Sequence, residues 1–211
     1  MKAVNYFIIK VDKAVNDTID VDGNELYLDN RFNEFEHRAM SGEIIAVPEK
    51  YSTGAKPGDI LYFHHNVLLG GQHMQYNGSE MQEEKGPRGQ VIDQKKGLYY
   101  ARYDKSDAFA NQCFAFKRGD KITMMGEWVF LEPYVVKPLE SKYLTLVLNK
   151  SMEDRNKYGI LKYSSPVAEE LGIKVGDRCW IRNSADYEME VEGEKVYRTY
   201  VGAIYGTVQE V

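Results

Sequence analysis

The sequence repeats an ordered set of motifs, and this internal similarity restricts the possible folds more than any other feature. The segments SGEIIAV and KPGDILYF have counterparts later in the chain, the four stretches being 41–47, 56–63, 158–163 (YGILKY) and 174–181 (KVGDRCWI). Gly58 and Gly176, which begin the two Gly-Asp pairs, are separated by 118 residues. The series predicts two tandem copies of one domain, with a single irregular β-protein as the alternative interpretation.

Short apolar runs separated by turn residues predict an all-β protein, with each copy forming a small β-barrel. The 16 tyrosines, together with many Val, Ile and Thr residues, favour strands over helices. We expect domain boundaries of 1–122 and 123–211, and one short helix at 166–171, where Ser165 can accept a hydrogen bond as N-cap. A hydrophilic, glycine-containing stretch at 70–96 in the first copy predicts a long loop or hairpin insertion.

Composition excludes several classes of protein. The formal net charge of −5 is the wrong sign for general nucleic-acid binding. No apolar run has the length of a membrane-spanning helix, and the first ten residues lack the order of a signal peptide, so we expect a cytoplasmic protein. Cys113 and Cys179 form no Cys-x-x-Cys spacing, which argues against a disulfide framework or a zinc cluster.

Residues able to perform catalysis do not form a recognisable pattern, so we expect no enzyme activity, no metal and no cofactor. The two Gly-Asp pairs read as turns in which the aspartate bonds nearby backbone amides. His64 and His65 are adjacent and point to opposite faces of a strand, and His73 lies apart from them, so a metal site is not indicated. The sequence contains no phosphate-binding glycine loop and no nucleophile elbow.

Two polar regions are candidate contact surfaces. Tyrosines 99, 100 and 103 with Arg102 resemble a stacking platform for single-stranded nucleic acid, although strand alternation sets Tyr99 and Tyr100 on opposite faces. The segment 16–38 is mainly polar but contains the apolar triplet Leu26-Tyr27-Leu28. This triplet is either an edge strand of its own barrel or a docking peptide.

The order of these motifs resembles the co-chaperonin family, the GroES-type lids of ring chaperonins, including its tandem plastid form and its divergent phage versions. The resemblance covers most of the chain and uses five motifs of the first copy: 6–11, Gly23 with 26–28, 42–47, 57–60 and 98–110. The corresponding stretches of the second copy are 128–132, 146–148, 159–163, 175–177 and 196–208. The resemblance implies two GroES-like barrels and assigns chaperonin contact to Gly23, Leu26, Tyr27 and Leu28.

Two hypotheses for function follow from the resemblance. In the first, the protein is a non-enzymatic, homo-oligomeric lid that docks on a ring chaperonin through the triplet. In the second, it is an auxiliary or decoration component of a phage particle that binds capsid proteins and reuses the same barrels as spacers. An oxidoreductase with the same kind of barrel would need a dinucleotide-binding glycine fingerprint, which this sequence lacks.

Overall fold

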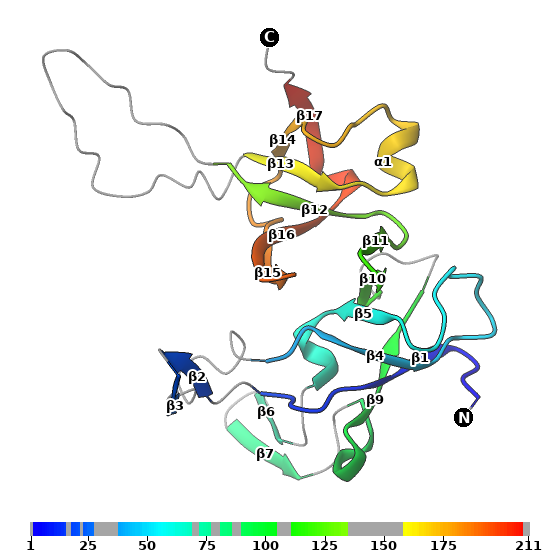
Figure 1. The fold of residues 1–211 in the computed structure, drawn as a ribbon, viewed down its shortest axis with the longest axis vertical. Coiled ribbons are helices and arrows are strands. Elements are labelled where there is room, and N and C mark those ends of the chain that lie inside the picture. Colours follow the sequence, from blue (N-terminus) through cyan, green and yellow to red (C-terminus); the bar gives the residue numbers. More distant parts are fainter. Residues whose placement is uncertain are drawn as a thin grey trace, which may run out of the picture. The chain divides into compact units, whose positions relative to one another are not determined.

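The computed structural model describes residues 2–15, 18–21, 23–27, 38–68, 72–76, 81–85, 90–104, 111–134 and 158–208. The chain divides into two compact units, Met1–Lys121 and Ile122–Val211 (Figure 1). Antiparallel strands dominate both units, and the described residues contain one α-helix, α1 (Pro166–Glu170). The all-β prediction is therefore confirmed. Within the described ranges, no helix has both the length and the apolar character needed to span a membrane.

The first sheet has seven strands in the order β11-β10-β5-β4-β1-β9-β8. Their bounds are β1 Tyr6–Lys10, β4 Ser41–Ala46, β5 Ile60–Phe63, β8 Val91–Asp93, β9 Leu98–Arg102, β10 Cys113–Arg118 and β11 Lys121–Met124. Short 3-10 helices, η1 (His65–Leu68) and η2 (Gln94–Lys96), follow β5 and β8. The largest fully buried side chains of this unit come mainly from its strands and include Phe7, Ile9, Ile44, Leu61, Phe63 and Phe114.

The second sheet has six strands in the order β15-β16-β12-β13-β14-β17. Their bounds are β12 Trp128–Pro133, β13 Tyr158–Tyr163, β14 Arg178–Ile181, β15 Tyr187–Val191, β16 Glu194–Tyr200 and β17 Ile204–Val208, with η3 (Val201–Ala203) between the last two. The core of this unit contains Val129, Leu131, Leu161, Cys179, Ile181 and Tyr197. The helix α1 adds Ala168 to this core, and the Ser165 hydroxyl accepts the Ala168 N–H at 3.3 Å, as the sequence predicts.

Both sheets follow the same plan. The order β10-β5-β4-β1-β9-β8 corresponds strand by strand to β17-β14-β13-β12-β16-β15. The register of β1 on β4 shifts after Ile8, and the register of β12 on β13 shifts after Phe130. A bulge at one step of a ladder is a specific feature, so its recurrence identifies Ile8 and Phe130 as corresponding positions.

The Gly-Asp turns give a second correspondence. In the first unit the Gly58 N–H donates to the Ile44 carbonyl at 2.8 Å, and an Asp59 carboxylate oxygen accepts the Lys56 N–H at 2.7 Å. The second unit has the same bonds, with Gly176 to Leu161 at 2.8 Å and Lys174 to Asp177 at 2.9 Å. Both aspartates therefore bond the backbone of their own turn, as the sequence interpretation expects.

The predicted insertion at 70–96 is only partly an insertion. Its strands β6 (Gln72–Tyr76) and β7 (Met81–Lys85) pair with each other as a hairpin. Its last residues, however, form β8 and η2, and β8 belongs to the main sheet with β15 as its counterpart. The sequence interpretation missed β8 because a three-residue strand gives too little alternation to detect.

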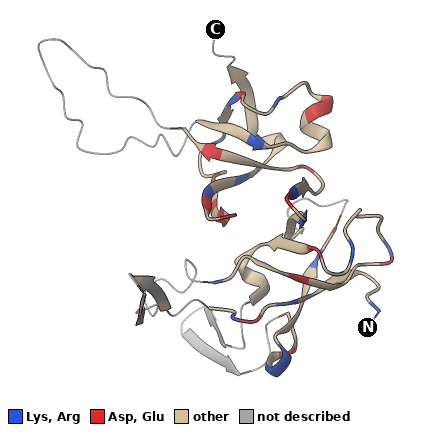
Figure 2. Ribbon diagram, viewed as in Figure 1, with Lys and Arg blue, Asp and Glu red and all other residues tan. Residues whose placement is uncertain are grey.

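Charged residues of both signs are distributed over the two units. Figure 2 shows basic residues on η2 and acidic residues on α1, with both signs on the strands. An ion pair joins Asp59 to Arg118, whose Nη2 lies 2.6 Å from Oδ2. In the second unit Lys162 contacts the carboxylates of Glu132, at 2.8 Å, and Glu194.

Candidate docking hairpin

A small hairpin occupies part of the segment between β1 and β4. Its strands, β2 (Thr18–Val21) and β3 (Asn24–Tyr27), pair with each other in register, from Thr18 opposite Tyr27 to Val21 opposite Asn24. Gly23 lies in the connecting turn with a φ of +80°. Among the described residues this two-stranded sheet is separate from the seven-stranded one (Figure 1). The edge-strand interpretation of the triplet would require pairing with the seven-stranded sheet, and in the described part of the chain β3 pairs with β2 instead.

Backbone contacts join the two ends of the segment that carries the hairpin, residues 14–15 and 38–39. Val15 and Arg38 form an antiparallel bridge, and the Ala39 N–H donates to the Ala14 carbonyl at 3.0 Å. The Lys13 ammonium donates to the Thr18 hydroxyl at 3.0 Å. The chain therefore leaves the sheet after β1 and returns beside its own point of departure before β4.

The structure places two of the predicted contact residues on the hairpin surface. The exposed fraction is 49% for Leu26 and 84% for Tyr27. Gly23 is also exposed, while Leu28 lies outside the described residues. Leu26 and Tyr27 are consecutive in a strand, so they face opposite sides of the hairpin.

Val21 is a contact candidate that the sequence interpretation missed. It is 43% exposed, and strand alternation sets it on the same side of the hairpin as Leu26. The signal for the hairpin was present, because an Asp-Gly pair between alternating residues predicts a tight two-residue turn. The equivalent segment of the second copy, including the expected contact residues at 146–148, lies outside the described residues.

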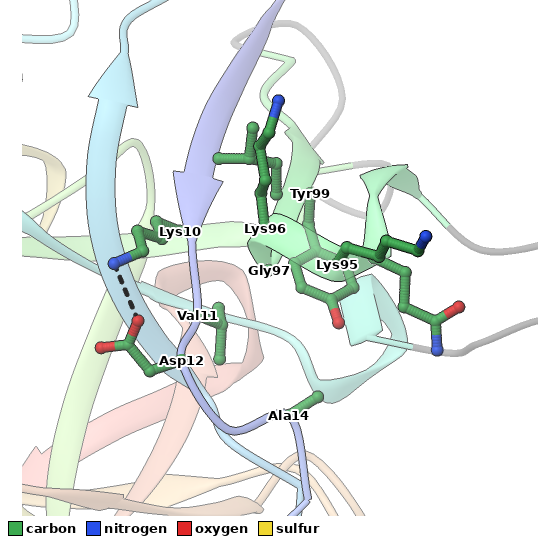
Figure 3. Close-up of a pocket in the computed structure, with 10 residues that line it drawn as sticks. Lys10, Val11, Asp12, Ala14, Lys95, Lys96, Gly97 and Tyr99 are labelled. Carbon is green, nitrogen blue, oxygen red and sulfur yellow. Dashed lines mark ion pairs between the residues drawn. The ribbon is translucent and has the colours of Figure 1, made fainter.

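A cavity of about 670 Å³ lies beside residues 10–14, where the chain leaves β1 toward the hairpin. Its wall contains three lysines, Lys10, Lys95 and Lys96. Figure 3 shows their side chains pointing in different directions, with Lys10 directed to Asp12. The Lys10 ammonium lies 2.9 Å from the Asp12 carboxylate, and this hydrogen bond raises the pKa of Lys10. The three cations do not converge on one point, so the cavity is not built to bind an anion.

The histidines considered from the sequence have the following surroundings in the described part of the chain. His64 and His65 follow β5 and do not lie on a strand, so the expectation that they point to opposite faces is wrong: His65 begins η1, and the two rings lie 4.4 Å apart. His64 Nδ1 accepts the Asn66 N–H at 3.1 Å. The His73 side chain lies outside the described part of the structure. Within that part, no group of three or more His, Cys, Asp or Glu residues is arranged to hold a metal.

The cysteines and the tyrosine platform are also explained by packing. Burial raises the pKa of the Cys113 thiol well above its ordinary value and that of Cys179 to about 11. Tyr99 and Tyr103 are each 6% exposed, so neither can offer a ring face to a nucleic-acid base. The stacking-platform interpretation is therefore wrong for these two residues, because they pack into the first unit.

Comparison with known proteins adds no family assignment: no protein-family model matches the chain, and no curated protein matches its sequence. Function is therefore inferred from the residues and contacts described above.

Proposed function

We propose that the protein is a non-enzymatic, co-chaperonin-like lid that docks on a ring chaperonin through the β2–β3 hairpin. The single observation that supports this proposal is the position, between β1 and β4, of a hairpin that exposes the hydrophobic side chains of Val21, Leu26 and Tyr27. In the family that the sequence resembles, the docking loop occupies the same place in the order of elements. The proposed contact residues are Gly23, Leu26, Tyr27 and Leu28, and Val21 joins them on the Leu26 side.

The proposed mechanism is physical binding without bond formation. Val21 and Leu26 each leave about half of the side chain exposed. Burying this exposed half of each side chain in an apolar groove is worth about 1 kcal/mol for each residue. One hairpin therefore binds weakly, and several hairpins on one assembly bind tightly because each additional contact is intramolecular.

Assembly into a homo-oligomer is part of the proposal. Among the described residues, the first sheet ends at β11 and β8, and the second ends at β15 and β17. Strand edges present unpaired backbone groups that can pair with another copy of the chain. Such pairing would bring several hairpins to one face of a ring.

A phage structural component is the second candidate. The observation that favours it is an exposed aromatic pair on the second unit, Trp180 on β14 and Tyr205 on β17, which are 48% and 62% exposed. Their ring centroids lie 5.6 Å apart. Exposed aromatic side chains are common anchors of protein–protein interfaces. Stoichiometric amounts of the chain in purified particles would support this candidate over the lid, since a folding helper does not remain in the particle.

Co-sedimentation with a chaperonin ring and ATP tests the lid proposal. We expect the double variant Leu26→Ser, Leu28→Ser to abolish co-sedimentation. The matched control is Leu171→Ser, which removes a 67% exposed leucine from the second unit and should leave binding intact. Unchanged binding of the double variant, or an equal loss in the control, would refute docking through this hairpin.

A further inference from the structure

The second sheet ends at β17, whereas the corresponding strand of the first sheet does not lie at an edge. That strand is β10, and β11 pairs with it on its outer side. Among the described residues of the second unit, β17 pairs with β14 and with no other strand. The last four of its five residues are exposed, while the first four residues of β10 are buried. The outer side of β17 is therefore an open position for one more strand.

The edge at β17 also differs in charge from the other ends of the two sheets. Its sequence, Ile-Tyr-Gly-Thr-Val, contains no charged residue. Each of the other end strands in the described part of the chain is charged, with Asp93 in β8, Lys121 in β11, and Glu188 and Glu190 in β15. Charged side chains on an edge strand oppose its pairing with another chain. The strand β17 lacks this protection.

The exposed side chains of this edge complement those of a second copy of β17. Gly206 lies opposite Trp180 of β14, and a Cβ built at Gly206 would have nothing within 4 Å. Gly206 thus leaves open space beside a tryptophan that is 48% exposed. Val208, two residues along the strand, is 42% exposed and offers an apolar side chain for such a space. Antiparallel pairing centred on Thr207 sets each Val208 opposite the other copy's Gly206.

We infer that two copies of the chain associate by antiparallel pairing of β17 with β17 about a two-fold axis. Thr207 of one copy lies opposite Thr207 of the other, and each Val208 packs over the other copy's Gly206 beside Trp180. A two-fold interface brings the same surface of both copies together. The uncharged β17 permits this, whereas two copies of β15 would bring glutamates together and repel. The inference names a contact for the homo-oligomer of the proposed function and rests on that part of it.

Sedimentation velocity of the full chain, in the absence of a chaperonin, tests the inference. We expect the wild type to form a dimer as its concentration is raised to about 100 μM. Thr207→Lys and Thr207→Glu should each weaken dimerisation about fivefold or more, because like charges then lie opposite each other across the axis. An equimolar mixture of the two variants should dimerise again, because a lysine then lies opposite a glutamate.

Mixing distinguishes this contact from pairing of β17 with a different edge, which opposite charges at position 207 would not restore. The matched control is Ile92→Lys, which adds a lysine to β8 at a 44% exposed position and should dimerise as the wild type does. Thermal unfolding verifies that each variant is folded. A monomeric wild type, undiminished dimerisation of the two variants, no recovery in their mixture, or an equal loss in the control would overturn the inference. Co-sedimentation with a chaperonin is measured separately, so failure of docking and failure of this contact are different results.

Discussion

Replacing Gly97 by alanine should destabilise the first unit far more than the same change at Gly58. Gly97 has a φ of +63°, and a Cβ built there would lie 2.2 Å from the Val11 carbonyl oxygen. Its own carbonyl accepts the Val11 N–H at 2.9 Å, which fixes β9 beside β1. Gly58 has a φ of +88° but nothing within 4 Å of its Cβ position. The two positions thus share the conformational penalty and differ in the steric clash.

The magnitudes follow from these contacts. A left-handed φ costs a non-glycine residue about 1–2 kcal/mol, and alanine recovers about 0.5 kcal/mol by restricting the unfolded chain. Gly58→Ala should therefore lower the free energy of unfolding by about 1 kcal/mol. At Gly97 the backbone must also move by about 1 Å and lose the hydrogen bond from the Val11 N–H. Gly97→Ala should therefore lower the free energy of unfolding by about 3–4 kcal/mol.

Urea unfolding followed by far-UV circular dichroism measures both effects. With a slope of about 2 kcal/mol per molar urea, the midpoint should fall by about 1.5 M or more for Gly97→Ala and by about 0.5 M for Gly58→Ala. Equal shifts in the two variants would refute the close approach of Gly97 to Val11.

Three other outcomes are expected. Asp59→Asn should destabilise the chain more than Asp177→Asn in urea unfolding, since Arg118 bonds Asp59 and no arginine among the described residues bonds Asp177 in the same way. The Arg118 hydrogen bonds lower the pKa of Asp59. The ion pair therefore contributes its full stability above the ordinary carboxyl pKa, and this stability is lost as the pH falls through the lowered pKa of Asp59. If acid does not destabilise the wild type more steeply than Asp59→Asn, the ion pair is contradicted. Glu192→Asn should raise the melting temperature, with a gain of about 0.5–1 kcal/mol, because Glu192 has a φ of +54° before Gly193 in a tight turn. Both cysteine thiols are buried and should react with a thiol reagent only after unfolding; fast labelling of the native chain would disprove their burial.

Local signals in the sequence predicted the parts of the fold that depend on neighbouring residues. The Gly-Asp turns were found because a turn residue and an aspartate act within four positions of the chain. The short helix was found for the same reason, since Ser165 and Pro166 mark its start. The corresponding bulges after Ile8 and Phe130 were not predictable, because they depend on the register between strands distant in sequence.

Features that depend on cross-strand contacts were missed for the same physical reason. The stack of Arg198 on Trp128 and Tyr187 joins residues up to 70 positions apart, and no short motif marks it. The apolar triplet was noticed, but Val21 was not, because its place beside Leu26 follows only from the turn at Gly23. Tyr99 and Tyr103 were considered as a contact surface because sequence alternation alone does not say which face of a strand is buried.

Hydrogen–deuterium exchange on the full chain, with and without a chaperonin ring and ATP, tests the lid proposal most directly. We expect slower exchange at residues 18–27 when the ring is present, and no change at the Gly176 turn of the second unit. Unchanged exchange across the hairpin under conditions where the ring and the chain are both intact would contradict docking through β2 and β3.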